Sequence, residues 1–297
     1  MHALNRYRNA NSLPALFSAH IEPNPKPSLA ALRRNRTHLF HESVTTRAKR
    51  ICGAALHHMT STALADIIRG TYYALRGQKS GFRLSNGYVG VLTDLSAANL
   101  AEHFTSGLLA GSGLSRASLQ APEYRRVVDL TTPHIRQPSA FSGTFSCDTN
   151  TDYVIARANA ERHFPYSEAL LHGFGALADA GLIHSVDMRD ENGTLVGGLF
   201  GVSSGRVFIV QGLFTATSDQ QTHLLDQVLH ILKGKKFILV DLTSVPTLSS
   251  KDEESMDRDD FTLCVAAHKS ALRMDSWTNF APTNALTQAT PALKMAA

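Results

Sequence analysis

The C-terminal half of the chain has the most regular pattern of apolar and polar positions. The pattern predicts two helices and then a three-stranded antiparallel meander, over residues 149–161, 166–180, 183–188, 194–202 and 206–211. Gly181 stands where a helix usually ends, because glycine readily adopts the left-handed backbone found there. Asn192-Gly193 and Ser203-Ser204-Gly205 are typical of tight turns between antiparallel strands.

Two further elements and a charged stretch follow the meander. Apolar residues at helical spacing predict a helix over 219–232, with Ser218 as its N-cap. The run 237–242 is apolar, which is typical of a central strand. The stretch 251–260 is strongly acidic, and we expect it to be a solvated loop.

The N-terminal half is less regular. Apolar residues at a spacing of four predict a helix over 46–77, residues 81–95 favour strands, and another helix is expected near 96–110. Residues 123–145 contain prolines and are expected to be an irregular connection between two lobes. The sequence therefore predicts a basic, largely disordered arm, an N-terminal lobe, a catalytic C-terminal lobe and a flexible tail, over residues 1–45, 46–140, 141–275 and 276–297.

Positive charge is concentrated near the N-terminus. The whole chain has 29 Lys and Arg against 25 Asp and Glu, but residues 1–50 contain nine basic and two acidic side chains. A basic arm fits a polyanionic partner, and it fits a solvated tail equally well. Three widely spaced cysteines, no apolar leader and no apolar run of membrane length lead us to expect a cytoplasmic protein that does not enter a membrane.

Several short patterns match known sites only as strings. Gly201-Val202-Ser203-Ser204-Gly205 fits the hydrolase elbow, but that elbow leads into a helix and this segment leads into a strand. Residues 50–55 resemble the pyrophosphate loop of acetyl-CoA-dependent N-acetyltransferases, yet no predicted strand precedes them, so we expect no acetyl-CoA and no other cofactor. The 14 histidines include no H-x-x-x-H pair on a convincing helix face, so no metal site is expected.

One long stretch closely resembles a known family. Its segments are Gly181–Asp187, Leu195–Val202, Gly205–Phe208 and Gln211–Phe214. Together they resemble the core of the leucyl/phenylalanyl-tRNA–protein transferases. A weaker likeness covers Ile68–Tyr73, Thr144–Asp148 and Val240–Thr243, so that the resemblance extends over residues 65–270.

The resemblance implies a fold and a reaction. The fold is α+β, with a small N-terminal α/β lobe and a C-terminal lobe related to N-acetyltransferases (GNAT-like) that has a mostly antiparallel sheet. In the reaction an amine attacks an aminoacyl-tRNA ester, which gives an amide and free tRNA. Because the ester is already activated, such a site mainly has to align amine and carbonyl, stabilise the oxyanion and handle one proton.

The two main catalytic positions implied by the resemblance carry different residues in this chain. Gln211 stands where the family has the glutamate of its Gly-Glu-Ser-Met-Phe segment. Thr243 stands where the family has a glutamine on a strand. Glutamine can orient an amine through its carbonyl, but it cannot take up a proton at neutral pH.

The remaining titratable candidates near the implied site are His184, Asp187 and Asp241, one of which can act as a base. Strand alternation puts His184 and Val186 on one face and Asp187 on the other. His184 can equally be a hydrogen-bond donor or a packed core histidine, and its spacing alone favours the core. We therefore take Gln211, Thr243, His184 and Asp241 as the catalytic candidates.

The family places its donor amino acid in an apolar pocket beside the 3′ adenosine. In this chain such a pocket can be supplied by Phe200, Phe208, Leu213, Phe214 and Tyr73. Ordinary core packing is the better explanation for at least half of the first four.

A tRNA partner would be bound mostly through its phosphates, which requires basic side chains. The first candidates cluster in the N-terminal lobe and are Arg47, Lys49, Arg50, Arg69, Arg76 and Lys79. Arg125-Arg126 and Lys233-Lys235-Lys236 are further candidates.

Three functions stay open on the sequence alone. The first is a specialised relative, of the kind found in natural-product biosynthesis, that moves an amino acid from aminoacyl-tRNA to a small-molecule or peptide amine. The second is an ordinary leucyl/phenylalanyl-tRNA–protein transferase acting on protein N-termini, and the third is a non-catalytic tRNA-binding module. The change at both catalytic positions favours the first, and a monomer is the default expectation.

Overall fold

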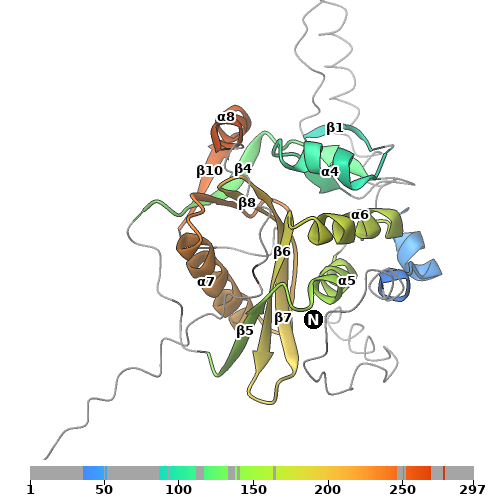
Figure 1. The fold of residues 1–297 in the computed structure, drawn as a ribbon, viewed down its shortest axis with the longest axis vertical. Helices are drawn as coiled ribbons and strands as arrows, with labels where there is room; N and C mark the ends of the chain where they lie inside the picture. Colours follow the sequence, from blue (N-terminus) through green and yellow to red (C-terminus); the bar gives the residue numbers. More distant parts are fainter. Residues whose placement is uncertain are drawn as a thin grey trace, which may run out of the picture. The chain divides into compact units, whose positions relative to one another are not determined.

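The computed structural model describes the chain from Arg36 onward, with gaps (Figure 1). Every described residue belongs to one compact unit, which begins at Arg36. The described residues are 36–49, 51, 87–92, 94–111, 117–132, 138, 141–162, 165–245, 250, 252–268 and 277. Within these ranges no helix is both long enough and apolar enough to cross a bilayer.

A seven-stranded sheet forms the centre of this unit. Its strands lie in the order β10-β4-β9-β8-β7-β6-β5, and each neighbouring pair is antiparallel except β8 and β9. The strands are β4 (Tyr124–Asp129), β5 (Gly143–Cys147), β6 (Ile183–Asp190), β7 (Leu195–Ser204), β8 (Val207–Thr215), β9 (Leu239–Asp241) and β10 (Glu253–Asp257). The mostly antiparallel sheet expected from the sequence is confirmed within a mixed α/β fold, whereas kinship with N-acetyltransferases and the domain boundaries stay predictions.

The meander β6-β7-β8 forms as the sequence predicts. Its two turns place Gly193 and Gly205 at φ values of +76° and +62°, a backbone conformation that residues with side chains rarely adopt. β8 continues to Thr215, beyond the predicted end at Gln211, because its second half pairs with the residues 197–200 of β7.

Helices cover both faces of the large sheet (Figure 1). On one face lie α5 (Thr151–Glu161) and α6 (Glu168–Asp179), where Phe174 packs edge-to-face against Phe200. On the other face lies α7 (Ser218–Gly234), whose Leu229 belongs to the same apolar cluster as Phe208. Burial of these two apolar layers is the main force that holds the helices on the sheet.

The N-terminus of α7 differs by one residue from the sequence prediction. Thr217, and not Ser218, is the N-cap. The Thr217 Oγ1 accepts a hydrogen bond from the Gln220 N–H at 3.2 Å, and the Gln220 Oε1 accepts one from the Thr217 N–H at 3.1 Å. This reciprocal capping box satisfies two backbone donors at once, which a cap at Ser218 would leave open.

A smaller antiparallel sheet precedes the large one in the sequence. Its strands, in the order β1-β3-β2, are β1 (Tyr88–Val91), β3 (Ser118–Gln120) and β2 (Leu109–Gly111). The connecting helix α4 (Ala97–Phe104) ends well before residue 110, because the chain turns at Gly107 (φ +83°) and enters β2. Phe104 packs on Phe174, which ties α4 to α6.

Two segments that were expected to be irregular belong to the large sheet. β4 and the first part of β5 lie within residues 123–145, which the sequence predicts to be an irregular connection. The acidic stretch 251–260 contains β10 and the first turn of α8 (Arg258–His268), so the prediction of a solvated loop is wrong. The backbone of β10 pairs with β4 at the sheet edge while its acidic side chains stay near water, an arrangement that suits an edge strand.

Arg36 joins the first described residues to the helical layer. Its guanidinium donates to Asp152 of α5 at 2.8 Å and to Asp179 of α6 at 2.6 and 2.8 Å. Gly175 provides the room, since a Cβ there would lie 2.7 Å from the Arg36 Nε. Residues 36–39 are helical, so this part of the predicted basic arm is packed against α5 and α6.

Candidate active site

Two neighbouring strands of the large sheet, β8 and β9, run parallel. They pair from Val207 with Leu239 to Ile209 with Asp241, where β9 ends while β8 continues to Thr215. Gln211, inside β8, and Thr243, just past β9, each lie two residues beyond that last pair. The fold therefore places the two positions that the resemblance marks as catalytic on neighbouring segments, just past the end of β9.

Gln211 is the extra residue of a β-bulge. Phe200 of β7 pairs with Gly212 and Gly201 pairs with Val210, so Gln211 has no partner across the ladder. Its backbone carbonyl instead accepts a hydrogen bond from the Arg162 Nη1 at 3.1 Å. A bulge interrupts strand pairing and turns a side chain out of the regular alternation, which is why bulges often lie beside active sites.

The side chain of Gln211 is completely buried, with 0% of its surface exposed. Neither its Oε1 nor its Nε2 has a hydrogen-bond partner among the described residues. The Tyr166 hydroxyl lies 3.3 Å from the Gln211 backbone carbonyl, so α5 and the segment after it hold the bulge from one side. A buried amide without partners costs about 1–3 kcal/mol, which a ligand with both donor and acceptor groups can recover.

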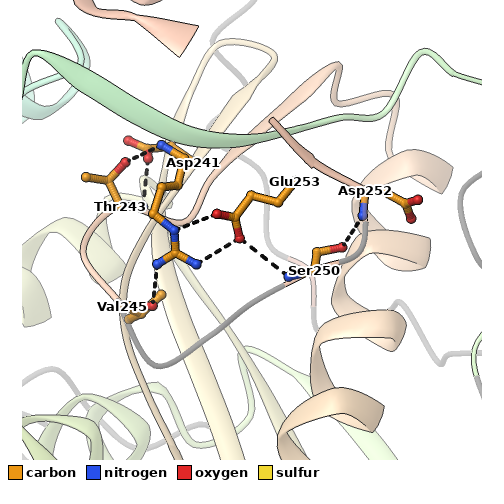
Figure 2. Close-up of polar contacts among 7 residues, drawn as sticks. Asp241, Thr243, Val245, Ser250, Asp252 and Glu253 are labelled. Carbon is orange, nitrogen blue, oxygen red and sulfur yellow. Dashed lines mark hydrogen bonds and ion pairs between the residues drawn. The ribbon is translucent and has the colours of Figure 1, made fainter. Parts of the chain in front are cut away.

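Thr243 is held just past the end of β9 (Figure 2). Its Oγ1 accepts a hydrogen bond from the backbone N–H of Arg126 at 2.9 Å, and its own N–H donates to the Asp241 Oδ1 at 2.9 Å. Since the hydroxyl oxygen acts as an acceptor there, its O–H proton stays available for donation to another group.

Asp241 forms a buried ion pair. Its Oδ2 lies 2.8 Å from the Arg125 Nη1, and both side chains are 1% exposed. Arg125 also donates to the backbone carbonyl of Gly107 and lies over the ring of Phe261, at 4.5 Å from its centroid. Burial lowers the pKa of Arg125, and the Asp241 carboxylate opposes that shift. A role for Asp241 as a base would require this pair to open.

His184 lies on β6, two strands away from β8. Its Nδ1 is 2.8 Å from the Asp148 Oδ2, and the Asp148 carboxylate also accepts the backbone N–H groups of Ser185 and Trp277 at 2.8 and 3.0 Å. The imidazole stacks flat on Trp277, with ring centroids 4.0 Å apart and an interplanar angle of 4°. The Nε2 is buried and has no partner among the described residues. The packed imidazole agrees with the core alternative, and a base role stays a prediction.

Asp187 lies on the opposite face of β6, as strand alternation predicts. Val186 belongs to the apolar cluster around α7, whereas the Asp187 Oδ2 accepts hydrogen bonds from the Ser146 hydroxyl at 2.9 Å and the Asn150 amide at 3.1 Å. Burial raises the pKa of Asp187, and these two hydrogen bonds oppose the shift. These hydrogen bonds direct the Asp187 carboxylate toward β5 and the start of α5, and not toward Gln211 or Thr243.

The apolar candidates divide between the two faces of the sheet. Phe200 and Phe214 belong to the cluster around α5 and α6, whereas Phe208 and Leu213 belong with α7. The bulge causes this division, because it reverses the alternation of β8 after Val210. These four side chains consequently do not surround one pocket, and Tyr73 lies outside the described residues.

The basic candidates divide in a similar way. Arg47 and Lys49 are exposed on a short helix over residues 44–49, where phosphate contacts are sterically open. Arg125 and Arg126 are engaged with Asp241 and Glu253 inside the sheet region. The remaining first-rank candidates, Arg50, Arg69, Arg76 and Lys79, lie outside the described residues.

Sequence reasoning missed Arg162, Tyr166, Asp148 and Trp277. Arg162 and Tyr166 follow α5 and stack on each other, with the guanidinium 4.0 Å from the ring centroid. No periodicity connects them with Gln211. Trp277 was open to notice as the single tryptophan of the chain, but its contact with His184 depends on the folded sheet.

Comparison with known proteins identifies relatives of this chain. The family model for leucyl/phenylalanyl-tRNA protein transferase matches residues 133–266, which include β5 to β10, Gln211 and Thr243. The leucyl/phenylalanyl-tRNA–protein transferase of Rubrobacter xylanophilus is 30% identical over 149 residues, which make up 48% of this chain and 78% of that relative. The chain belongs to the leucyl/phenylalanyl-tRNA–protein transferase family. This family consists of aminoacyl-tRNA-dependent aminoacyltransferases, so the expected enzyme class is confirmed.

Two further relatives illustrate the range of coverage. The relative from Alkalilimnicola ehrlichii is 29% identical over 144 residues, covering 45% of this chain and 56% of its own length. A relative from Pseudomonas putida is 25% identical over 204 residues, covering 65% of this chain and 89% of its own length. Both carry the same name as the relative from Rubrobacter xylanophilus.

Proposed function

We propose that this family member transfers an amino acid from an aminoacyl-tRNA to an amine of a small molecule or peptide in a biosynthetic reaction, and not to protein N-termini. The observation that carries the proposal is Gln211, a buried and unpartnered amide where the resemblance expects a glutamate. A glutamate at this place could pair with a cationic amine and take up its proton, whereas the amide can accept a hydrogen bond from the amine but cannot take up its proton. The acceptor is therefore an amine that arrives neutral or loses its proton elsewhere.

The chemical step is the same for any amine acceptor. The amine nitrogen attacks the ester carbonyl carbon, an N–C bond forms, and the C–O bond to the terminal ribose breaks. The tRNA leaves with a free hydroxyl, which takes up the proton that the amine nitrogen loses. The protein contributes mainly alignment of the two reactants, because the ester is already activated.

Gln211 and Thr243 have complementary roles in this proposal. The Gln211 Oε1 accepts an N–H of the attacking amine and aims its lone pair at the carbonyl. The Thr243 hydroxyl, whose oxygen already accepts the Arg126 N–H, donates its proton as a hydrogen bond to the developing oxyanion. Gln211 lies inside β8 and Thr243 just past β9, and neither has to change its protonation state.

The donor side of the proposed site uses apolar and basic residues. Phe200 and Phe214, on the α5 and α6 face beyond the bulge, are proposed to border the donor side chain. Arg47 and Lys49 are proposed to contact tRNA phosphates, so that affinity falls as the salt concentration rises.

The alternative is an ordinary transferase that acts on protein N-termini. The names of the relatives favour it, because each is called a leucyl/phenylalanyl-tRNA–protein transferase. Under this alternative Gln211 supports transfer of Leu or Phe to a peptide with an N-terminal Arg or Lys.

A panel of labelled aminoacyl-tRNAs, offered with small amines and with peptides that begin with Arg or Lys, separates the candidates. We expect an amide product with a small-molecule or short-peptide acceptor, and no product after the tRNA is digested with ribonuclease. Transfer only to the N-terminal Arg or Lys peptides would establish the alternative. Salt-dependent tRNA binding with no product from any pair would instead identify a binding module.

The variant Gln211→Glu sharpens the same panel. If the amide selects the acceptor, the glutamate variant should gain transfer to the basic peptides and lose transfer to the acceptor of the wild type. An unchanged acceptor preference would contradict the role given to Gln211. Gln227→Glu, at a buried glutamine of α7, is the matched control and should leave the preference unchanged.

A further inference from the structure

Arg126 of β4 forms hydrogen bonds with Thr243 and Val245, which follow β9, and with Glu253 of β10 (the three partners are labelled in Figure 2). Its backbone N–H donates to the Thr243 Oγ1 at 2.9 Å, and its Nη1 donates to the Val245 carbonyl at 3.4 Å. Its Nε and Nη2 donate to the two oxygens of Glu253 at 2.6 and 2.8 Å. One residue therefore connects the beginning of the segment that follows β9 with β10, where the segment ends.

The contact with Thr243 replaces part of the strand ladder. The Leu242 N–H donates to the Arg126 carbonyl at 2.7 Å, which continues the antiparallel pairing of β9 with β4. The Arg126 N–H, however, is taken up by the Thr243 side chain and not by a backbone carbonyl. The hydroxyl oxygen is thus fixed relative to the sheet, and its position depends on where Arg126 lies.

Glu253 closes the arrangement on the β10 side. Its side chain is 19% exposed and that of Arg126 is 29% exposed, so the pair is only partly open to water. The bidentate hydrogen bond from Arg126 lowers the pKa of Glu253, which keeps the carboxylate ionised at neutral pH. Ser250 adds a backbone N–H to the Glu253 Oε2 at 3.5 Å.

We propose that Arg126, held by Glu253, is a positioning residue for the transfer reaction: it sets the Thr243 hydroxyl just past the end of β9, next to the strand that carries Gln211. Arg126 then acts within the protein and is not one of the contacts to tRNA phosphates. This inference rests on the proposed function, because it gives Thr243 a place in the reaction. Displacement of a reactive group by even a fraction of its hydrogen-bond length lowers turnover, since alignment supplies much of the rate.

The test is Glu253→Gln, compared with Glu254→Gln as the matched control. Both variants remove one negative charge from β10, but Glu254 is exposed and pairs with Val127 only through its backbone. We expect Glu253→Gln to lower kcat about 10-fold with KM for aminoacyl-tRNA unchanged. We expect Glu254→Gln to match the wild type, and the exchanged pair Arg126→Glu with Glu253→Arg to recover part of the lost kcat.

A second measurement does not depend on activity. Hydrogen exchange of the peptide that covers residues 242–253 should be faster in Glu253→Gln than in Glu254→Gln. Equal kcat and equal exchange in the two variants would overturn the positioning role. A raised KM with a weaker salt dependence in Glu253→Gln or Arg126→Lys would overturn it as well, because it would make Arg126 a phosphate contact.

Failure of the proposed function gives a different experimental result from failure of the positioning role alone. If the wild type forms no amide with any acceptor, the transfer reaction fails and the positioning role fails with it. If the wild type is active and only the Glu253→Gln result disagrees, the transfer reaction stands and Arg126 is merely structural.

Discussion

Two buried polar groups on the neighbouring strands β8 and β9 have opposite hydrogen-bonding environments. Asp241 receives hydrogen bonds from Arg125 and from the Thr243 backbone, so its carboxylate is fully engaged. Gln211 is equally buried, but its amide meets no partner among the described residues. A buried polar group with partners keeps its hydrogen bonds, whereas one without partners costs stability. The comparison separates a group that is engaged within the fold from one whose hydrogen-bonding capacity is left unused among the described residues.

The largest loss of stability is expected when the ion pair of Asp241 and Arg125 is broken. Asp241→Ala leaves the Arg125 guanidinium buried without a counter-charge, and we expect a loss of about 3–5 kcal/mol in the free energy of unfolding. Urea unfolding followed by circular dichroism measures it. The double variant Arg125→Met with Asp241→Leu should lose much less, because no charge then remains buried. A loss below about 1 kcal/mol in Asp241→Ala would mean that the ion pair of Asp241 and Arg125 does little to stabilise the fold.

Replacing the unpaired amide of Gln211 should lower turnover without lowering stability. In Gln211→Leu the buried amide is gone, so the free energy of unfolding should stay level or rise by about 1–2 kcal/mol. Turnover should fall about 100-fold, because the amine loses the group that orients it. Gln227→Leu, in α7, is the matched control for turnover. A clearly destabilised Gln211→Leu variant with normal turnover would make Gln211 an ordinary core residue.

Asp148 is a third polar group of this comparison. Replacing it tests whether the hydrogen bonds around His184 stabilise the fold, as those of Asp241 are expected to do. Asp148→Asn removes the charge that receives three N–H groups, and it tolerates the left-handed backbone there (φ +53°). We expect a loss of about 2 kcal/mol and a change in the emission of Trp277, the single tryptophan. Thermal unfolding and tryptophan fluorescence measure these effects. A variant with unchanged stability and unchanged emission would show that the hydrogen bonds of Asp148 do not stabilise the fold.

The smallest effect concerns the partly exposed pair of Arg126 and Glu253. The pKa of Glu253 is lower in the folded protein than in the unfolded chain, so its stabilisation is present above a pH of about 4.3 and is lost as the pH falls through the folded pKa. Glu253→Gln should cost less than about 1 kcal/mol at pH 7 and nothing at pH 2. Urea unfolding of both proteins at the two pH values checks this, with Glu254→Gln as the control. A difference that persists at pH 2 would show that the charge is not its cause.

The meander and its turns were predictable because their signals are local. Asn192-Gly193 and the alternation of β6 and β7 act over a few neighbouring residues. β10 was not predictable, since its acidic residues take up strand structure only where β4 offers an edge. Asp148 and Trp277 are 129 positions apart, and no pattern of the sequence indicates that they meet over His184. For the candidate site, the resemblance proposes Gln211 and Thr243, whereas the contacts around them come from the tertiary fold.

The bulge at Gln211 has a consequence for how this position can vary. The extra backbone residue, and not the type of its side chain, sets the alternation of β8 on either side of the bulge. Removing the residue would shorten β8 by one and turn every later side chain through half a rotation, so that Phe214 would leave α5 for the side of α7 and Leu213 would move the opposite way. Relatives that fold alike should therefore differ here in residue type and never in length.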